Sequence, residues 1–174
     1  MDFWQAIHRR HSVREFDPGA DVPPEQVQRI LEAAIESPSA GNCQPWHFVV
    51  VRDLAVRQGL AKAAYGQAFL AQAPVVIVVC CDPARSTPRY GQRGLRLYSL
   101  QDTAAATEHI LLAATALGLG SCWVGAFNEA AATRVLGLPK HLRPVALVAI
   151  GHPAAPSSRH TTRRPLEQVV SFRE

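Results

Sequence analysis

One run of seven consecutive apolar residues, from Val75 to Cys81, constrains the fold of this chain more than any other feature. A strand with one solvated face alternates apolar and polar side chains, whereas a strand covered on both faces is apolar throughout. The run therefore predicts a central β-strand with helices against both faces of its sheet. Further strands are predicted at residues 46–51, 123–127 and 145–150, and an edge strand in the alternating tail at residues 164–172.

Helical patterns separate these strands. Asp2 is expected to cap a short first helix, with Phe3 and Ile7 facing inward. The other predicted helices begin at Pro23 and Pro24 and stop before Pro38, span residues 54–64, run from Leu97 to Leu117 before Gly118, and extend from an Asn128 cap to Leu136. Residues 82–94 are predicted as a surface loop. This alternation predicts an α+β chain, a three-layer α-β-α sandwich around a mixed sheet.

The chain's length and apolar content indicate one cytoplasmic domain, residues 1–174. No linker divides its 174 residues, and the longest apolar run, residues 73–81, is less than half a membrane span. The N-terminus has no apolar stretch after its basic residues, so no secretory signal is expected. The cysteines form no CxxC pair, and free thiols are predicted at Cys43, Cys80, Cys81 and Cys122.

Arginine accounts for 16 of the 18 basic residues, and the net charge is +4. Two groups of arginines stand near the ends of the chain: Arg9, Arg10 and Arg14, and Arg159, Arg163 and Arg164. One interpretation is a solvated basic surface; another is a single anionic ligand held by both termini, because guanidinium groups suit phosphate. Nucleic acid is not expected as a partner, because no long basic stripe with aromatics is present.

Most motifs of catalysis are missing from the sequence. It has no GxSxG, no phosphate-binding GxxxxGK[ST], no HExxH and no GxGxxG after a strand. His8 and His11 are three residues apart, but without a second ligand pair they do not indicate a metal site. We therefore predict no metal site, and none of these motifs indicates a catalytic side chain.

Three segments, taken in order, carry a resemblance to one family. They are Arg10-His11-Ser12-Val13-Arg14-Glu15-Phe16, the loop and strand entry from Pro38 to Trp46, and the run from Ala116 to Phe127. Each alone is compatible with an ordinary helix end, turn or core strand. Together they resemble the FMN-dependent nitroreductases, and the resemblance extends over nearly the whole chain.

The resemblance implies a sandwich whose two subunits interlock as a homodimer, with FMN in each of two interface clefts. Carried over by position, four groups of residues would surround the flavin. They are Arg10, His11, Ser12 and Arg14 at its phosphate and pyrimidine side; Pro38, Ser39, Ala40 and Asn42 from the other subunit; Gln67 at the polar edge of the ring; and Val124, Gly125 and Ala126 near N5. Arg163 and Arg164 would complete the phosphate site.

The resemblance also implies the chemistry. NADH or NADPH would deliver hydride to the flavin, and a small-molecule acceptor such as a nitroaromatic or a quinone would then enter the same cleft. Arg14 would favour reduction by placing positive charge near N1 of the ring. The short segment 82–96, where many members carry a helical excursion, and Gly125, where some carry an acidic residue, leave the substrate open. A dehalogenating or oxidative flavoenzyme and a non-enzymatic flavin-binding module are the alternatives.

Overall fold

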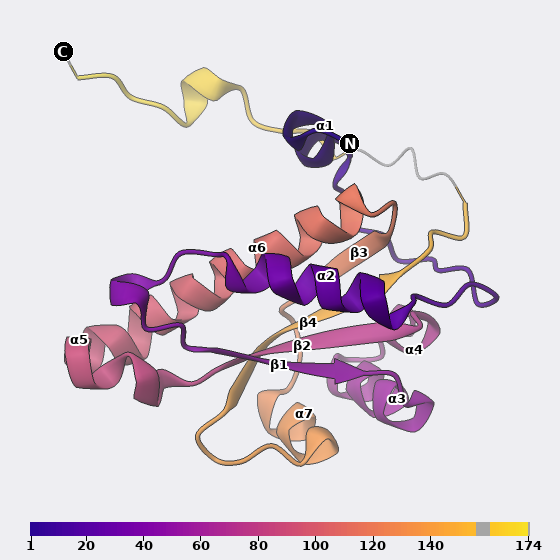
Figure 1. Cartoon of the computed structure of the whole chain (residues 1–174), viewed down its shortest axis with the longest axis horizontal. Coiled ribbons are helices and arrows are strands. Elements are labelled where there is room, and N and C mark those ends of the chain that lie inside the picture. The colour runs from indigo at the N-terminus through magenta and orange to yellow at the C-terminus, as the bar shows by residue number, and fades with distance from the viewer. Residues whose placement is uncertain (156–160, 174) are drawn as a thin grey trace.

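The computed structural model describes residues 1–155 and 161–173, which build a four-stranded sheet with helices on both faces (Figure 1). Strand β2 (Val75–Cys81) lies between β1 (Trp46–Val51) and β4 (Arg143–Gly151), and β3 (Gly120–Val124) pairs with the other side of β4. Every residue of β2 is buried, so the prediction of a central strand is confirmed. Among the described residues, no helix is both long enough and apolar enough to cross a membrane.

Alternate side chains of β2 pack into two separate cores. Val76, Val78 and Cys80 face the helices α3 (Leu54–Ala63), α4 (Phe69–Gln72) and α7 (Glu129–Leu136). Val75, Ile77 and Val79 face α2 (Pro24–Ile35) and α6 (Ser99–Ala116). Figure 1 shows α2 and α6 above the sheet and the other three helices below it. The predicted α+β class and three-layer sandwich are confirmed.

The strand directions differ from the predicted mixed sheet, because all three strand pairs in the described chain are antiparallel. The reason lies in the connections. Helices α3 and α4 return the chain to the same end of the sheet, so β2 runs antiparallel to β1. Helix α6 leads to β3, which runs parallel to β2, but β4 lies between these two strands. The one parallel contact is an isolated bridge between Ser12 and Ser121.

Local capping follows the sequence closely. The side chains of Asp2 and Asn128 accept hydrogen bonds from the first-turn amides of α1 (Phe3–Arg9) and α7, as predicted. The inward orientation predicted for Phe3 and Ile7 is wrong, because these side chains are 62% and 38% exposed. Helix α1 lies at the margin of the molecule, where the rest of the chain covers only part of the helix's apolar face.

Two further expectations are corrected. Residues 82–94 are helical, not a loop: η2 (Pro83–Arg85), α5 (Thr87–Arg93) and η3 (Gly94–Tyr98) lead into α6. Both prolines of the segment occupy first turns, where a helix tolerates the missing N–H. The tail from residue 161 to 173 contains a single short turn, η4 (Leu166–Gln168), and no strand. It runs away from the sheet (Figure 1), so it meets no strand of this chain with which to pair.

The four cysteines are free thiols, as predicted, with Cys43 half-buried and the other three buried. Burial and, to a lesser extent, the neighbouring Cys81 raise the pKa of the Cys80 thiol to about 12. At neutral pH this thiol is therefore protonated and behaves as a small apolar side chain of the core.

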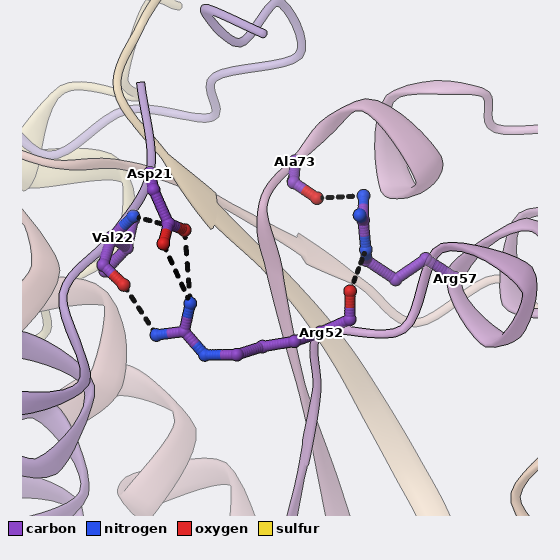
Figure 2. Close-up of polar contacts among 5 residues, drawn as sticks. All are labelled: Asp21, Val22, Arg52, Arg57 and Ala73. Carbon is purple, nitrogen blue, oxygen red and sulfur yellow. Dashed lines mark hydrogen bonds and ion pairs between the residues drawn. The ribbon is translucent and has the colours of Figure 1, made fainter. Parts of the chain in front are cut away.

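Arg52 and Arg57 stabilise the fold through contacts within the chain (Figure 2). Arg57 donates to the carbonyls of Ala71 and Ala73 at the end of α4, the second at 2.5 Å, and its Nε reaches the Arg52 carbonyl at 3.2 Å. Arg52 itself joins the Asp21 carboxylate at 3.1 Å and the Val22 carbonyl. Helix-end carbonyls lack partners within the helix, so Arg57 satisfies them with a charged donor.

Replacing Arg57 with alanine is expected to lower the free energy of unfolding by about 2–3 kcal/mol, because hydrogen bonds to charged donors are lost and partly buried carbonyls stay unsatisfied. Urea denaturation measures the change. Asp21→Asn is the matched control: it removes an exposed ion pair with Arg52, and a loss below about 1 kcal/mol is expected. Equal losses for both variants would contradict this role of Arg57.

Candidate functional site

A cavity of about 520 Å³ lies where the opening motif meets the C-terminal tail. Its lining consists mostly of cationic and hydroxyl side chains: Ile7, His8, Arg10, His11, Ser12, Arg14, Thr161 and Arg163. Four predicted site residues of the opening motif thus share one cavity with Arg163, from the far end of the sequence. Among the described residues, the lining contains three arginines and no carboxylate; Glu108 of α6 lies 3.9 Å from Arg10.

The two tail arginines that were predicted together have different environments. Arg163 lines the cavity and donates to the Thr161 side chain at 2.8 Å. Arg164 donates to the Gln168 carbonyl at 2.9 Å, within the tail, and is not among the lining residues. Arg159 lies outside the described residues. The structure therefore distinguishes the environments of Arg163 and Arg164, whereas the sequence pattern gave both the same role.

The opening motif is fixed against β3. The Val13 amide donates to the Ser121 carbonyl at 2.9 Å. A side chain on Gly120 would come within 2.9 Å of Val13, so only glycine allows this approach. Burial raises the pKa of the Cys122 thiol, although the charge of Arg14 and a hydrogen bond with Ser12 partly offset this. The first and third motifs therefore meet along one strand.

The end of β3 carries a second group of predicted site residues. Val124 is buried at the end of the strand, and Gly125 and Ala126 follow it at the surface. The Gln67 side chain donates to the Ala126 carbonyl at 3.3 Å and to the Ala64 carbonyl at 3.1 Å. The structure therefore brings Gln67 together with the turn after β3, although none of these residues lines the cavity.

The predicted loop residues Pro38, Ser39, Ala40 and Asn42 lie elsewhere. They form the short turn η1 (Ala40–Asn42) and the two residues before it, and this turn contacts α5 and the beginning of α6. The Arg89 guanidinium donates to the Gly41 carbonyl at 3.1 Å. Figure 1 shows α5 at the left of the sheet, apart from α1 and the tail, which lie above the molecule. Within one chain, these four residues do not join the cavity.

Two side chains that hold this loop were not identified from the sequence. Arg89 belongs to the segment that was interpreted as a loop. Asp102 accepts a hydrogen bond from the Ala40 amide at 3.0 Å and is only 7% exposed. Burial raises the pKa of Asp102, and the Ala40 bond partly opposes that shift. The available signal was an acid beside the apolar positions of an alanine-rich helix, where a buried carboxylate is unusual unless it has a partner.

Within residues 1–155 and 161–173, no group of three His, Cys, Asp or Glu side chains is arranged to hold a metal ion. The cavity lining carries three guanidinium groups, which bind anions and repel cations.

Comparisons with known proteins agree on one family. A model of the Nitroreductase family matches residues 7–69 and 62–152. The chain is 35% identical over 202 aligned positions to a Thermus thermophilus protein named NADH dehydrogenase, covering 99% of this chain and 97% of the relative. It is 26% identical to a Helicobacter acinonychis protein named oxygen-insensitive NADPH nitroreductase, covering 97% and 95%.

A solved structure of similar fold supports the same assignment. The nitroreductase family protein from Streptococcus pneumoniae superimposes with a TM-score of 0.89 at 26% identity, covering 99% of this chain and all of that one. Motif order, fold and sequence similarity over most of the length therefore point the same way: this chain is a member of the nitroreductase family.

Proposed function

We propose that the protein is an FMN-dependent oxidoreductase that takes electrons from NADH or NADPH and passes them to a small-molecule acceptor such as a nitroaromatic or a quinone. The observation that carries this proposal is the arginine-lined cavity between the opening motif and the tail. Membership in the nitroreductase family and the names of the relatives support the oxidoreductase class and the nicotinamide donor.

The cavity suits the phosphate end of FMN. Its volume of about 520 Å³ is in the range of cofactor sites. Arg10, Arg14 and Arg163 can neutralise a phosphate, and the Ser12 and Thr161 hydroxyls can donate to its oxygens. Gln67 and the turn at residues 124–126, which lie beside the same strand, are proposed to contact the ring of the flavin.

The proposed site is completed by a second copy of the chain. Three observations support a homodimer: the loop Pro38–Asn42 lies far from the cavity of its own chain, α1 exposes Phe3 and Trp4, and the tail exposes Phe172 at 86%. Such aromatic side chains are typical of the centres of protein interfaces. In this arrangement each loop contributes to the partner's FMN site.

When bound, FMN would supply the hydride chemistry, first accepting from the nicotinamide and then donating to the acceptor in a ping-pong exchange. The side chains of this protein bind and orient the reactants. Arg10 and Arg163 hold the phosphate, and Arg14 adds a fixed positive charge that favours the reduced cofactor. No protein nucleophile and no metal take part in the proposed reaction.

Absorbance and anaerobic reduction test the proposal. The purified dimer, loaded with FMN, is expected to absorb near about 450 nm and to lose this band within seconds when mixed with NADH or NADPH without oxygen. Reoxidation by a nitroaromatic or a quinone should restore it. Absence of FMN binding would refute the cofactor assignment, and binding without reduction would indicate a non-enzymatic flavin-binding module instead.

Arg14→Gln is expected to lower the two-electron potential of the bound flavin by roughly 20–45 mV. The substitution removes a positive charge that stabilises the reduced cofactor by about 1–2 kcal/mol after solvent screening. A redox titration against a reference dye, at saturating FMN, measures the potential. Arg9→Gln is the matched control, because Arg9 is close in sequence but does not line the cavity. An unchanged potential in the Arg14 variant would show that this arginine has only a structural role.

A further inference from the structure

The loop around η1 has a backbone that needs outside support. Gly41, Asn42 and Gln44 all have left-handed backbone angles, with φ of 55°, 56° and 49°. Only glycine adopts this region without strain, and the other two residues have an energetic penalty there. A side chain on Gly41 would also displace the ends of the Tyr90 and Arg89 side chains, which lie against it. The conformation therefore depends on neighbours that hold it.

Asp102 provides the buried part of that support. It lies in the first turn of α6, and its Oδ1 accepts from the Ala40 amide across the gap between helix and loop. Its Oδ2 is buried and has no hydrogen-bond partner among the described residues. Burying a carboxylate with one unsatisfied oxygen is unfavourable, so a purely structural helix position would favour an apolar residue.

Exposed hydrogen bonds surround the one between Asp102 and the Ala40 amide. Arg89 donates to the Gly41 carbonyl, Arg85 donates to the Cys43 carbonyl at 3.1 Å, and the Ser39 hydroxyl accepts from the Gln44 amide at 3.0 Å. Solvent competes more strongly for each of these exposed bonds than for the part-buried bond between Asp102 and Ala40. Asp102 is therefore the contact that most firmly sets the position of the loop.

We propose that Asp102 is a positioning residue for cofactor binding: its carboxylate fixes the Ala40 backbone, and thereby the shape in which the loop Pro38–Asn42 meets the FMN of the partner subunit. The part that concerns FMN rests on the proposed function. The part that concerns the loop rests on the contacts of this chain alone. The two parts can be tested separately.

Amide hydrogen exchange on the FMN-free dimer tests the loop. The Asn42 and Cys43 amides donate to the Ser39 and Ala40 carbonyls within the turn, so their exchange rates report its integrity. Asp102→Ala is expected to speed their exchange by about 10-fold, and Asp102→Asn, which keeps a carbonyl oxygen for the Ala40 amide, by less than about 3-fold. Unchanged exchange in Asp102→Ala would overturn the proposal, as would equal acceleration in Asp102→Asn.

Ala40→Pro supplies a second variant that leaves the interior of α6 untouched. It removes the N–H that Asp102 accepts, at the first position of a short helical turn where proline is tolerated and after an extended Ser39. If Asp102 acts through this N–H, the double variant should exchange no faster than the faster of the two single variants. Additive effects would overturn the proposed contact. This variant also keeps the test decisive if Asp102→Ala fails to fold.

FMN titration tests the link to the cofactor. Asp102→Ala is expected to weaken FMN and riboflavin binding equally, by about 10-fold, because the loop is remote from the phosphate cavity of its own chain; Asp102→Asn should restore most of the affinity. Faster exchange with unchanged FMN affinity, in a wild-type protein that binds FMN, would overturn the positioning role. A wild-type protein that binds no FMN would refute the proposed function, while the exchange data would still decide the role of Asp102 in the loop.

Discussion

Arg163→Ala is expected to weaken FMN binding by about 10- to 150-fold and riboflavin binding far less. The reason is that Arg163 lies in the arginine-lined cavity, where its proposed partner is the phosphate that riboflavin lacks. A hydrogen bond to a charged group contributes roughly 1.5–3 kcal/mol, which corresponds to this range of affinity. Fluorescence titration of the FMN-free protein with each flavin gives both dissociation constants.

Arg164→Ala is the matched control for this prediction. Arg164 is the next residue, has the same charge, and bonds within the tail to the Gln168 carbonyl instead of lining the cavity. Less than about a 3-fold change in FMN affinity is expected, because only a long-range charge is lost. Equal losses of FMN and riboflavin affinity in Arg163→Ala, or a larger loss in Arg164→Ala, would show that the phosphate is held elsewhere.

The double substitution Phe3→Asp and Trp4→Asp is expected to convert the proposed homodimer to a monomer and to lower FMN affinity by at least about 100-fold. These side chains are 62% and 67% exposed in the single chain, and the centroids of their rings lie 5.4 Å apart. Interface aromatics of this kind each contribute roughly 2–4 kcal/mol, and a buried carboxylate adds a further penalty. FMN affinity should fall with dimerisation, because the loop Pro38–Asn42 would no longer reach the partner's site.

Light scattering combined with absorbance measures both effects. Leu54→Asp serves as the control, because Leu54 is a similarly exposed apolar residue, at 53%, but it begins α3 below the sheet. That variant should remain a dimer with bound FMN. A monomer that retains one FMN per chain would refute the shared site, and a wild-type protein that is monomeric at micromolar concentration would refute the proposed dimer.

The sequence by itself determined much of the local structure, although not the helices at residues 83–98. The apolar run from Val75 to Cys81 identified the central strand, and the caps at Asp2 and Asn128 located the first turns of two helices. These features depend on neighbours within a few residues, so periodicity and capping chemistry are enough to predict them. The three motifs, taken in order, also identified the family.

Only the tertiary structure decided which distant segments meet. It placed Arg163 in the cavity and Arg164 outside it, although the two are adjacent in sequence. It also inserted β4 between β2 and β3, which makes every strand pair antiparallel. The carboxylate of Asp102 found its partner 62 positions away, on the Ala40 amide. Such contacts depend on the whole path of the chain, because local propensity fixes where an element forms but not what packs against it.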